Sequence, residues 1–272
     1  MDECRITVLM SVYNCENTIE KCIDSLLAQD YPGWKMVVCD DASTDSTFDI
    51  LNRYKEKYLE KFIVLKNDTN RRTAYSVNRC LEFADTEFIA RMDGDDYCAA
   101  DRFSKEIEFL DKHRDFDLVG SSMHVFDGQK VVATVTHKQI PQKKDIVKTS
   151  CFTNGSVLAR SEVFKMLGGY NEAEDAARVE DFEFWCRFFE AGFRGYNLSE
   201  PIYYYFEDAQ SIKRRSARAC INGAKVSYKY IKKFELPFWY FVYPLRRLIT
   251  AVTPKFVYRA VRGFKLKNNL SE

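Results

Sequence analysis

The sequence predicts an α/β fold in which a mostly parallel central sheet is flanked by helices. Short apolar runs alternate with segments whose apolar residues recur every three or four positions. Parallel strands need a crossover connection of this kind, and such crossovers are nearly always right-handed. Two of the apolar runs end in carboxylates, at 40–41 and 93–96. Because ligands bind at the carboxyl ends of parallel strands, these acids predict a polar cleft at that edge.

The first hundred residues contain four predicted strands separated by helices. The strands are apolar throughout, as expected for strands that are buried on both faces. After the first strand, apolar residues from Ile19 to Leu27 share one helical face, Asn17 is the expected cap, and Pro32-Gly33 ends the segment. The expected segments are strand 6–12, a helix from 17, strand 35–39, helix 46–57, strand 62–65, helix 74–84 and strand 88–92.

After residue 100 the pattern changes, and the sequence predicts a mixed or antiparallel continuation of the sheet. Two strands flank Asp127-Gly128, a pair that favours a hairpin. The expected segments are helix 102–113, strands 117–126 and 130–136, strand 154–158, a turn at 168–170, a helix from 179 and strand 201–206.

The charge of the chain is divided unevenly between a body, residues 1–210, and a helical extension, residues 211–272. The net charge of the whole is +1, but the extension holds 15 Lys/Arg and 2 Asp/Glu. The body holds 26 Lys/Arg and 38 Asp/Glu. A basic helical tail on an acidic body is typical of a segment that meets phosphate or an anionic membrane surface.

Residues 236–245 form a strongly aromatic segment within this basic extension. A spanning helix needs about 20 apolar residues, whereas this run is shorter, holds two prolines and is followed by Arg246-Arg247. Basic segments that carry residues such as Trp239 and Tyr243 lie on membranes rather than crossing them. The alternative is a tail that packs on the body with its lysines in solvent.

The cysteines and the N-terminus point to a reducing compartment. The nine cysteines are scattered without a C-x-x-C pair, and no signal-peptide pattern opens the chain. We therefore expect free thiols in a cytoplasmic protein that is peripheral at the inner face of a membrane, and no nucleic-acid partner.

Three carboxylates within four residues, Asp93, Asp95 and Asp96, follow the fourth predicted strand. They repel one another unless a cation or hydrogen-bond donors compensate. A hard divalent ion is the simplest compensation, and such ions often bridge carboxylates to substrate phosphates. An acidic turn in solvent is the alternative, because Asp-Gly is a common turn pair. The second acidic strand end, Asp40-Asp41, favours the cleft.

Five motifs follow one another in a fixed order over roughly residues 5–206. They are Ile6–Asn14, Val38–Asp45, Ile89–Asp96, Gly168-Gly169-Tyr170 and Glu180-Asp181 with Trp185. Their order and spacing resemble those of family 2 glycosyltransferases with the GT-A fold. The resemblance implies an inverting transferase that uses a nucleotide-sugar donor and Mn²⁺ or Mg²⁺. It also implies transfer of a single sugar, because the Q-x-x-R-W motif of processive synthases is absent.

The resemblance further implies roles for particular residues. Asp181 would be the general base and Asp95 the metal ligand. Asp41 would contact the uracil of a UDP-sugar, and Asp93 would lie toward the ribose. The nucleotide-sugar-binding residues that it implies are Ser11, Tyr13, Asp41, Arg72, Asp93 and Gly94.

Arg72 departs from the family pattern, in which glycine is common at this position. The departure leaves the local loop geometry open, although Arg71 or Arg72 could contact the diphosphate. By the same resemblance, residues 1–100 form a nucleotide-binding half and residues 101–210 an acceptor-binding half. The acceptor would be a glycan or a lipid-linked saccharide.

Three other classes of protein share parts of this pattern. A HAD-like phosphotransferase also carries Asp-x-Asp after a strand, but that motif normally ends the first strand and is followed by Thr or Val. A nucleotidyltransferase is similar in fold, but the N-terminus lacks a Gly-rich phosphate loop. A protein that binds a nucleotide sugar without catalysis is the remaining alternative, which Asp41, Asp93, Asp95 and Asp181 disfavour.

Overall fold

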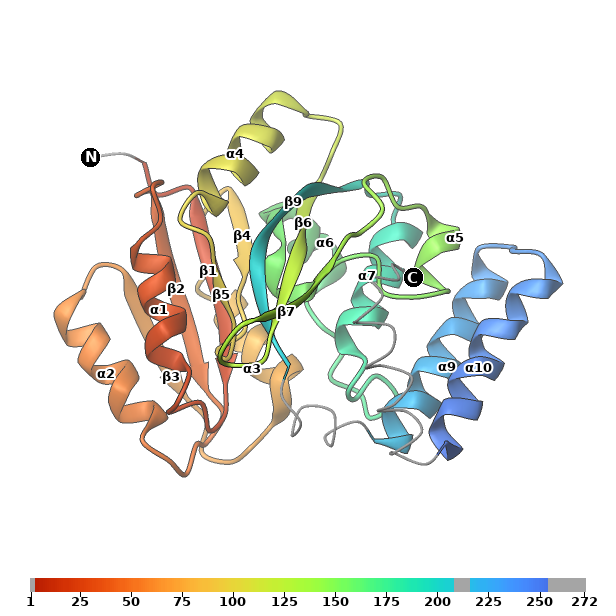
Figure 1. The fold of residues 1–272 in the computed structure, drawn as a ribbon, viewed down its shortest axis with the longest axis horizontal. Helices are drawn as coiled ribbons and strands as arrows, with labels where there is room; N and C mark the ends of the chain where they lie inside the picture. The colour runs from red at the N-terminus through yellow and green to blue at the C-terminus, as the bar shows by residue number, and fades with distance from the viewer. Residues whose placement is uncertain (1–2, 208–215, 254–272) are drawn as a thin grey trace.

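The computed structural model describes residues 3–207 and 216–253. The predicted boundary at residue 210, Arg214-Arg215 and the tail beyond 253 lie outside these residues. A central sheet carries helices on both faces, and two long C-terminal helices lie at one end of the molecule (Figure 1). The α/β fold predicted from the sequence is confirmed.

Nine strands form one sheet in the described part of the chain, in the order β3-β2-β1-β4-β8-β6-β9-β5, with β7 paired to β6. The part β3-β2-β1-β4 is parallel. Beyond it the sheet is mixed, because β8 is antiparallel to both β4 and β6 whereas β9 is parallel to β6. The strands are β1 (Ile6–Val12), β2 (Trp34–Asp40), β3 (Phe62–Lys66), β4 (Phe88–Arg91), β5 (Tyr97–Cys98), β6 (Leu118–Phe126), β7 (Val131–Val135), β8 (Leu158–Arg160) and β9 (Gly195–Phe206).

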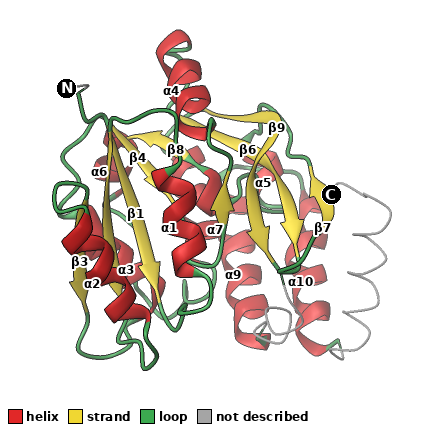
Figure 2. Ribbon diagram, turned by 60° about the vertical axis from the view of Figure 1, so that its left-hand side comes forward, coloured by secondary structure: helices red, strands yellow, loops and turns green. Residues whose placement is uncertain are grey.

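Helices cover both faces of this sheet. In Figure 2, α1 and α2 lie in front of the parallel strands and α3 lies behind them. The helices are α1 (Ile19–Leu27), α2 (Thr47–Lys57), α3 (Arg72–Leu81), α4 (Arg102–Lys112), α5 (Lys143–Ile146), α6 (Ser161–Leu167), α7 (Glu180–Glu190), α9 (Ala217–Lys233) and α10 (Val242–Val252), with 3₁₀ turns η1 (Asn154–Ser156) and η2 (Phe238–Phe241).

Two apolar cores follow from the alternation of side chains along the strands. Successive residues of a strand point to opposite faces. Met10 of β1 therefore packs in one core with Ile23 of α1, whereas Leu9 packs in the other with Val77 of α3. The second core extends through α6 and α7 to Tyr230 of α9.

The register of the parallel strands brings their carboxyl ends to one edge. Val12 of β1 is opposite Asp40 of β2, and Leu9 is opposite Arg91 of β4. The residues that follow these strands, including Asp41 and the turn Asp93-Gly94-Asp95 (the D-x-D turn), therefore meet at the same edge of the sheet.

Two local predictions are wrong. The first helix begins at Ile19 with Thr18 as its N-cap and no side-chain cap, not at Asn17. The hydroxyl of Thr18 instead donates to the carbonyl of Gly94 at 3.0 Å, which ties the start of α1 to the D-x-D turn. The expected strand 154–158 begins only at Leu158, because the N–H of Ser156 turns back to the carbonyl of Thr153 and closes η1.

Within its described part, residues 216–253, the C-terminal segment is helical, as the sequence predicts. Its helix α9 packs on the body, where Val226, Tyr230 and Phe234 are buried in the same core as residues of α7. Within the described ranges, no helix is both long and apolar enough to cross a membrane.

Candidate active site

A cleft of about 1930 Å³ opens at the carboxyl edge of the parallel strands. Its volume is ample for a nucleotide sugar, since pockets for drug-sized ligands measure about 300–1,000 Å³. The cleft brings together every site residue predicted from the sequence, and their roles stay predictions. Its wall includes Ser11, Tyr13, Asp41, Arg72, Asp93, Gly94, Asp95 and Asp181.

The loops after β1 and β2 are joined to each other by hydrogen bonds. The N–H of Asn14 donates to the hydroxyl of Ser43 at 3.0 Å, and the side-chain oxygen of Asn14 accepts from the N–H of Thr44 at 2.9 Å. The N–H of Asp41 donates to the carbonyl of Val12 at 2.8 Å. These hydrogen bonds hold the carboxyl ends of β1 and β2 side by side at one end of the cleft.

Asp41 fixes the start of α3. One of its oxygens accepts from the N–H of Arg71 and the other from the N–H of Arg72, both at 2.8 Å. The side-chain amide of Asn67 donates to Asp41 at 2.6 Å. Asp41 is 2% exposed, so only a small part of its side chain borders the cleft. Its hydrogen bonds fix the shape of the loop that carries Arg71 and Arg72.

The backbone is strained around the cleft. Arg72 has φ of +70°, the left-handed conformation that favours glycine. The loop therefore keeps a conformation suited to the glycine that is common in the family, although the residue is arginine. Among the described residues, Asn14, Ala42 and Arg178 also have positive φ in or beside the cleft. Strain of this kind concentrates at functional sites.

The D-x-D turn leaves β4 through a glycine that packs against β1. A Cβ on Gly94 would lie 2.6 Å from a methyl carbon of Val12, so no larger residue fits there without movement. On either side of Gly94, Asp93 and Asp95 are half-buried and face the cleft. The small residue thus allows the turn to lie directly on the end of the first strand.

Asp96 is a structural acid behind the turn. It is 2% exposed, and it accepts hydrogen bonds from the hydroxyl of Tyr203 at 2.6 Å and from the N–H of Phe206 at 2.7 Å. Burial, followed by the charges of Asp95 and Asp93, raises the pKa of Asp96 well above its usual range. These contacts attach the D-x-D turn to β9.

Arg91 is a fully buried cation directly before the motif. Its guanidinium donates to the carbonyl of Leu9 and, at 3.3 Å, to Asp93. It thereby orients Asp93 and offsets part of the negative charge of the turn. No role for Arg91 was predicted from the sequence, although an arginine within an apolar strand was a signal for one.

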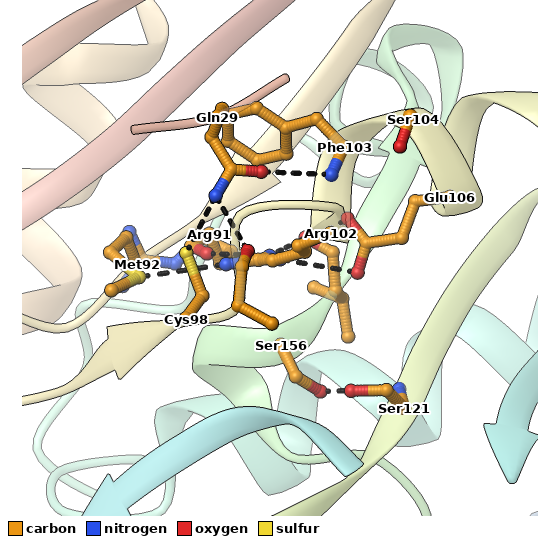
Figure 3. A network of polar contacts seen from close by, with 12 residues as sticks. Gln29, Arg91, Met92, Cys98, Arg102, Phe103, Ser104, Glu106, Ser121 and Ser156 are labelled. Atoms are coloured by element: carbon orange, nitrogen blue, oxygen red, sulfur yellow. Dashed lines mark hydrogen bonds and ion pairs between the residues drawn. The ribbon is translucent and has the colours of Figure 1, made fainter. Parts of the chain in front are cut away.

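A second buried arginine, Arg102 of α4, supports the same strand end (Figure 3). Its Nε lies 3.2 Å from both oxygens of Glu106, and both side chains are fully buried. Its Nη2 donates to the carbonyl of Arg91 at 3.1 Å. Burial raises the pKa of Glu106 to about 7, against the opposing effect of Arg102. This network holds α4 under the residues that precede Asp93.

Asp181 lies in the first turn of α7, on the opposite wall of the cleft. One of its oxygens accepts from the N–H of Phe182 at 2.7 Å. Burial raises the pKa of Asp181, that hydrogen bond lowers it, and the nearby charge of Asp93 raises it further. Asp93, distant in sequence, is thus close enough to affect the ionisation of Asp181.

Tyr170 lies between these acids, and the sequence analysis assigned it no role. Its ring is 5.8 Å from the guanidinium of Arg91, and its hydroxyl donates to Asn154 at 2.9 Å. The turn that carries it ends α6 at Gly168, as the sequence predicts, with Gly168 in the left-handed conformation. Tyr170 therefore places an aromatic ring beside the buried cation that orients Asp93.

The helix α10 contributes Tyr243 and Arg246 to the cleft wall. No pattern in the sequence predicted this contribution, since neither a membrane-bound tail nor a tail packed on the body implied contact with the cleft. Only the packing of α9 and α10 beside α7 places these side chains there.

The described residues contain no group of three or more His, Cys, Asp or Glu side chains that could hold a metal by themselves. Mg²⁺, and Mn²⁺ by analogy, is commonly held by one or two carboxylates together with substrate phosphates. Asp95, at the cleft beside Asp93, offers a hard oxygen ligand of this type. The residues present therefore fit a metal that is bound jointly by protein and donor.

Comparison with known proteins decides the family. The model of "Glycosyl transferase family 2" matches residues 7–167. The chain belongs to this family. It is 38% identical over 250 residues to EpsE, a candidate glycosyltransferase of Bacillus subtilis, covering 92% of this chain and 90% of the relative. This family 2 member is therefore a glycosyltransferase, and the phosphotransferase and nucleotidyltransferase alternatives are disfavoured.

A more distant relative has a name that specifies its donor and its acceptor. The Escherichia coli enzyme WfaP, a UDP-Glc:α-D-GlcNAc-diphosphoundecaprenol β-1,3-glucosyltransferase, is 24% identical over 221 residues and covers 81% of this chain and 84% of its own.

Solved structures share the architecture of this chain. TarS of S. aureus with UDP has a TM-score of 0.67 at 23% identity, covering 97% of this chain and 75% of that chain. The mannosyltransferase PcManGT of Pyrobaculum calidifontis, with GDP-Man and Mn²⁺, has a TM-score of 0.62 at 20% identity, covering 95% and 79%. The fold of this family 2 member is accordingly GT-A.

Proposed function

We propose that the protein is an inverting glycosyltransferase that moves one sugar from a UDP-sugar to a hydroxyl of a glycan or lipid-linked saccharide. One observation carries the proposal: Asp41, the pair Asp93 and Asp95, and Asp181, from three separate segments, line a single cleft large enough for the donor. TarS with UDP, similar in fold, and WfaP, named for a UDP-glucose donor, support the choice of nucleotide.

The donor would bind along the carboxyl edge of β1, β2 and β4. Ser11 and Tyr13 would flank the nucleotide, Asp41 would meet the uracil at its exposed edge, and Asp93 would meet the ribose. The first turn of α3 would face the diphosphate. A helix N-terminus favours anions, and Arg72 lies there with its guanidinium 2.9 Å from Glu174.

Asp95 would hold Mn²⁺ or Mg²⁺ together with the diphosphate oxygens. When bound, the ion acts as a Lewis acid that neutralises charge on the departing diphosphate. The Mn²⁺ in the PcManGT complex supports this assignment. Gly94 keeps Asp95 at this position because it lets the turn approach Val12 closely.

Asp181 would act as the general base. As the acceptor oxygen attacks the anomeric carbon from the face opposite UDP, its proton passes to the carboxylate of Asp181. The bond from the anomeric carbon to the diphosphate oxygen breaks, and UDP leaves with the electron pair. The configuration inverts in this single displacement. The raised pKa of Asp181 suits a base, because proton acceptors are most effective near the working pH.

The acceptor and the location of the protein are proposed with the same enzyme. The basic C-terminal segment would lie against a membrane surface at the cytoplasmic face, where a lipid-linked acceptor is available. The excess of 15 Lys/Arg over 2 Asp/Glu in residues 211–272 and the diphosphoundecaprenol in the name of WfaP support this choice.

Slow hydrolysis of the donor tests the proposal without a known acceptor. UDP-glucose and UDP-GlcNAc are incubated with the protein and Mn²⁺, and release of UDP is measured. An active transferase releases UDP slowly, because water takes the place of the acceptor.

The variant Asp181→Asn should lose about 10²–10⁴-fold of this release, since that is the usual contribution of a general base. Calorimetry should show unchanged affinity for UDP with Mn²⁺. Wild-type rates in the variant would remove Asp181 from the mechanism. Binding of UDP-sugars without any release would favour the non-catalytic alternative.

A further inference from the structure

An apolar stripe along helix α10 and the preceding 3₁₀ segment η2 faces away from the body. Amphipathic helices normally direct this stripe toward the core. Here its side chains are 55–82% exposed, and their spacing by four and three places them on one face. The α10 stripe consists of Phe238, Val242, Leu245, Ile249 and Val252. A contiguous exposed apolar surface of this kind marks an interaction site.

The side of α10 next to this stripe borders the cleft. Tyr243 and Arg246, one helical turn apart, line the cleft. The guanidinium of Arg247 lies 4.4 Å from the ring centre of Phe182, the residue after the proposed base. One helix therefore borders the cleft and also carries an uncovered apolar stripe.

The surroundings of the stripe are aromatic and positively charged. Trp239 is 61% exposed beside it. On α9, the ring of Tyr228 lies 5.3 Å from that of Phe241, and the ammonium of Lys232 lies 4.5 Å from the Tyr228 ring. Residues 216–253 contain seven Lys/Arg and one acid, Glu235.

We propose that the α10 stripe lies in the interface of an anionic membrane and holds the Arg246 end of the cleft at the bilayer surface. Charge complementarity selects this occupant, because basic residues and interfacial aromatics favour anionic lipid. A symmetric contact with a second copy would bring two positive surfaces together, which is unfavourable. With 11 residues, α10 is too short to span a bilayer and lies along its surface.

This geometry gives the acceptor a route to the active site. A saccharide attached to a membrane lipid would extend from the headgroup layer past Tyr243 and Arg246 toward Asp181. The route rests on the function proposed above, whereas the membrane contact does not depend on it.

Co-sedimentation with lipid vesicles tests the membrane contact. The full chain is mixed with vesicles of phosphatidylcholine containing phosphatidylglycerol, and with vesicles of phosphatidylcholine alone. We expect binding to the anionic vesicles that weakens as NaCl is raised. The double variant Leu245→Ser/Ile249→Ser should bind them at least about tenfold more weakly, since two exposed aliphatic side chains that would enter the lipid are lost. The control Met166→Ser, at an equally exposed position on α6, should bind like the wild type.

Three outcomes overturn the inference: no binding of the wild type to anionic vesicles, equal loss in the control, or a dimer in analytical ultracentrifugation that the double variant abolishes. UDP-sugar hydrolysis without vesicles is measured in parallel and should be unchanged in the double variant. Vesicle binding without hydrolysis would contradict the proposed transferase and leave the docking surface standing. Hydrolysis without vesicle binding would contradict the docking surface and leave the proposed transferase standing.

Discussion

Asp41 shows how a single residue serves both the backbone and the cleft. Its carboxylate accepts from the N–H groups of Arg71 and Arg72, which fixes the first turn of α3. The same carboxylate reaches the cleft where the nucleotide would bind. Its replacement would therefore disturb the loop geometry and the nucleotide contact together, and a loss of activity alone would not separate the two roles.

Arg72 allows a cleaner separation, because its backbone and side chain can be tested apart. The variants Arg72→Gly and Arg72→Ala both remove the guanidinium, but only glycine relieves the left-handed backbone at φ of +70°. We expect the glycine variant to be more stable than the alanine variant by about 1 kcal/mol. Urea unfolding measures the difference.

If the guanidinium contacts the diphosphate, the two Arg72 variants should lose affinity for UDP with Mn²⁺ to the same extent. An alanine variant as stable as the glycine variant would show that the loop relaxes and that the strain has no energetic consequence.

At the scale of elements, α4 holds the carboxyl end of β4 in place. Arg102 reaches from α4 to the carbonyls of Arg91 and Val157, at 3.1 and 3.4 Å. A buried guanidinium needs a partner, and Glu106, one turn farther along α4, supplies it. The position of Asp93 therefore depends on an ion pair that does not touch the cleft.

The raised pKa of Glu106 predicts a pH-dependent stability. The folded carboxyl titrates at about 7 and its ordinary value is 4.5, so between these values the folded state binds more protons than the unfolded state. The contribution of Glu106 is therefore present at low pH and is lost as pH rises from 4.5 through 7. The variant Glu106→Gln has no carboxyl group at this position, so its stability should not show this decrease with rising pH.

Urea unfolding at about pH 5 and about pH 8 measures the effect. The stability of the wild type relative to Glu106→Gln should be greater at the lower pH. The control Glu108→Gln, at an exposed position on the same helix, should give no such change. Parallel behaviour of the wild type and Glu106→Gln at both values would contradict the raised pKa.

At the scale of the whole molecule, the cleft joins the parallel half of the sheet to the helical C-terminal part. Asp93 and Asp95 come from the sheet edge, Asp181 from α7, and Arg246 from α10. A donor bound between these parts would contact all of them, so binding should stabilise the complete fold.

We therefore expect UDP with Mn²⁺ to raise the Tm of the full chain. A ligand at 100 times its Kd adds about 2.7 kcal/mol, and each kcal/mol shifts Tm by about 2–4 °C in a chain of this size. The variant Asp95→Ala should lose the part of the shift that depends on Mn²⁺ and keep the shift from UDP alone. Equal Mn²⁺-dependent shifts in the wild type and the variant would exclude Asp95 as the metal ligand.

Particular residues show why some features could be predicted and others could not. The acids at 41, 93 and 95 follow apolar runs, and the shared edge of parallel strands implies that they meet. Arg91 and Asp96 belong to the same stretch, but their partners Leu9 and Tyr203 lie far away along the chain. Whether such a charge is buried or exposed depends on contacts that no local pattern records.

The sequence by itself determined the alternation of strands and helices except for the short elements β5 and α5, the acidic strand ends and the family, because these depend on local periodicity and on motifs read along the chain. Only the tertiary structure decided that Asp181 lies near Asp93 in one cleft and that Arg246 of α10 lines the same cleft. It also decided that the apolar stripe of α10 is exposed. The reason is physical. The face of a helix that is covered depends on the elements that pack against it, and the sequence of the helix alone does not specify those elements.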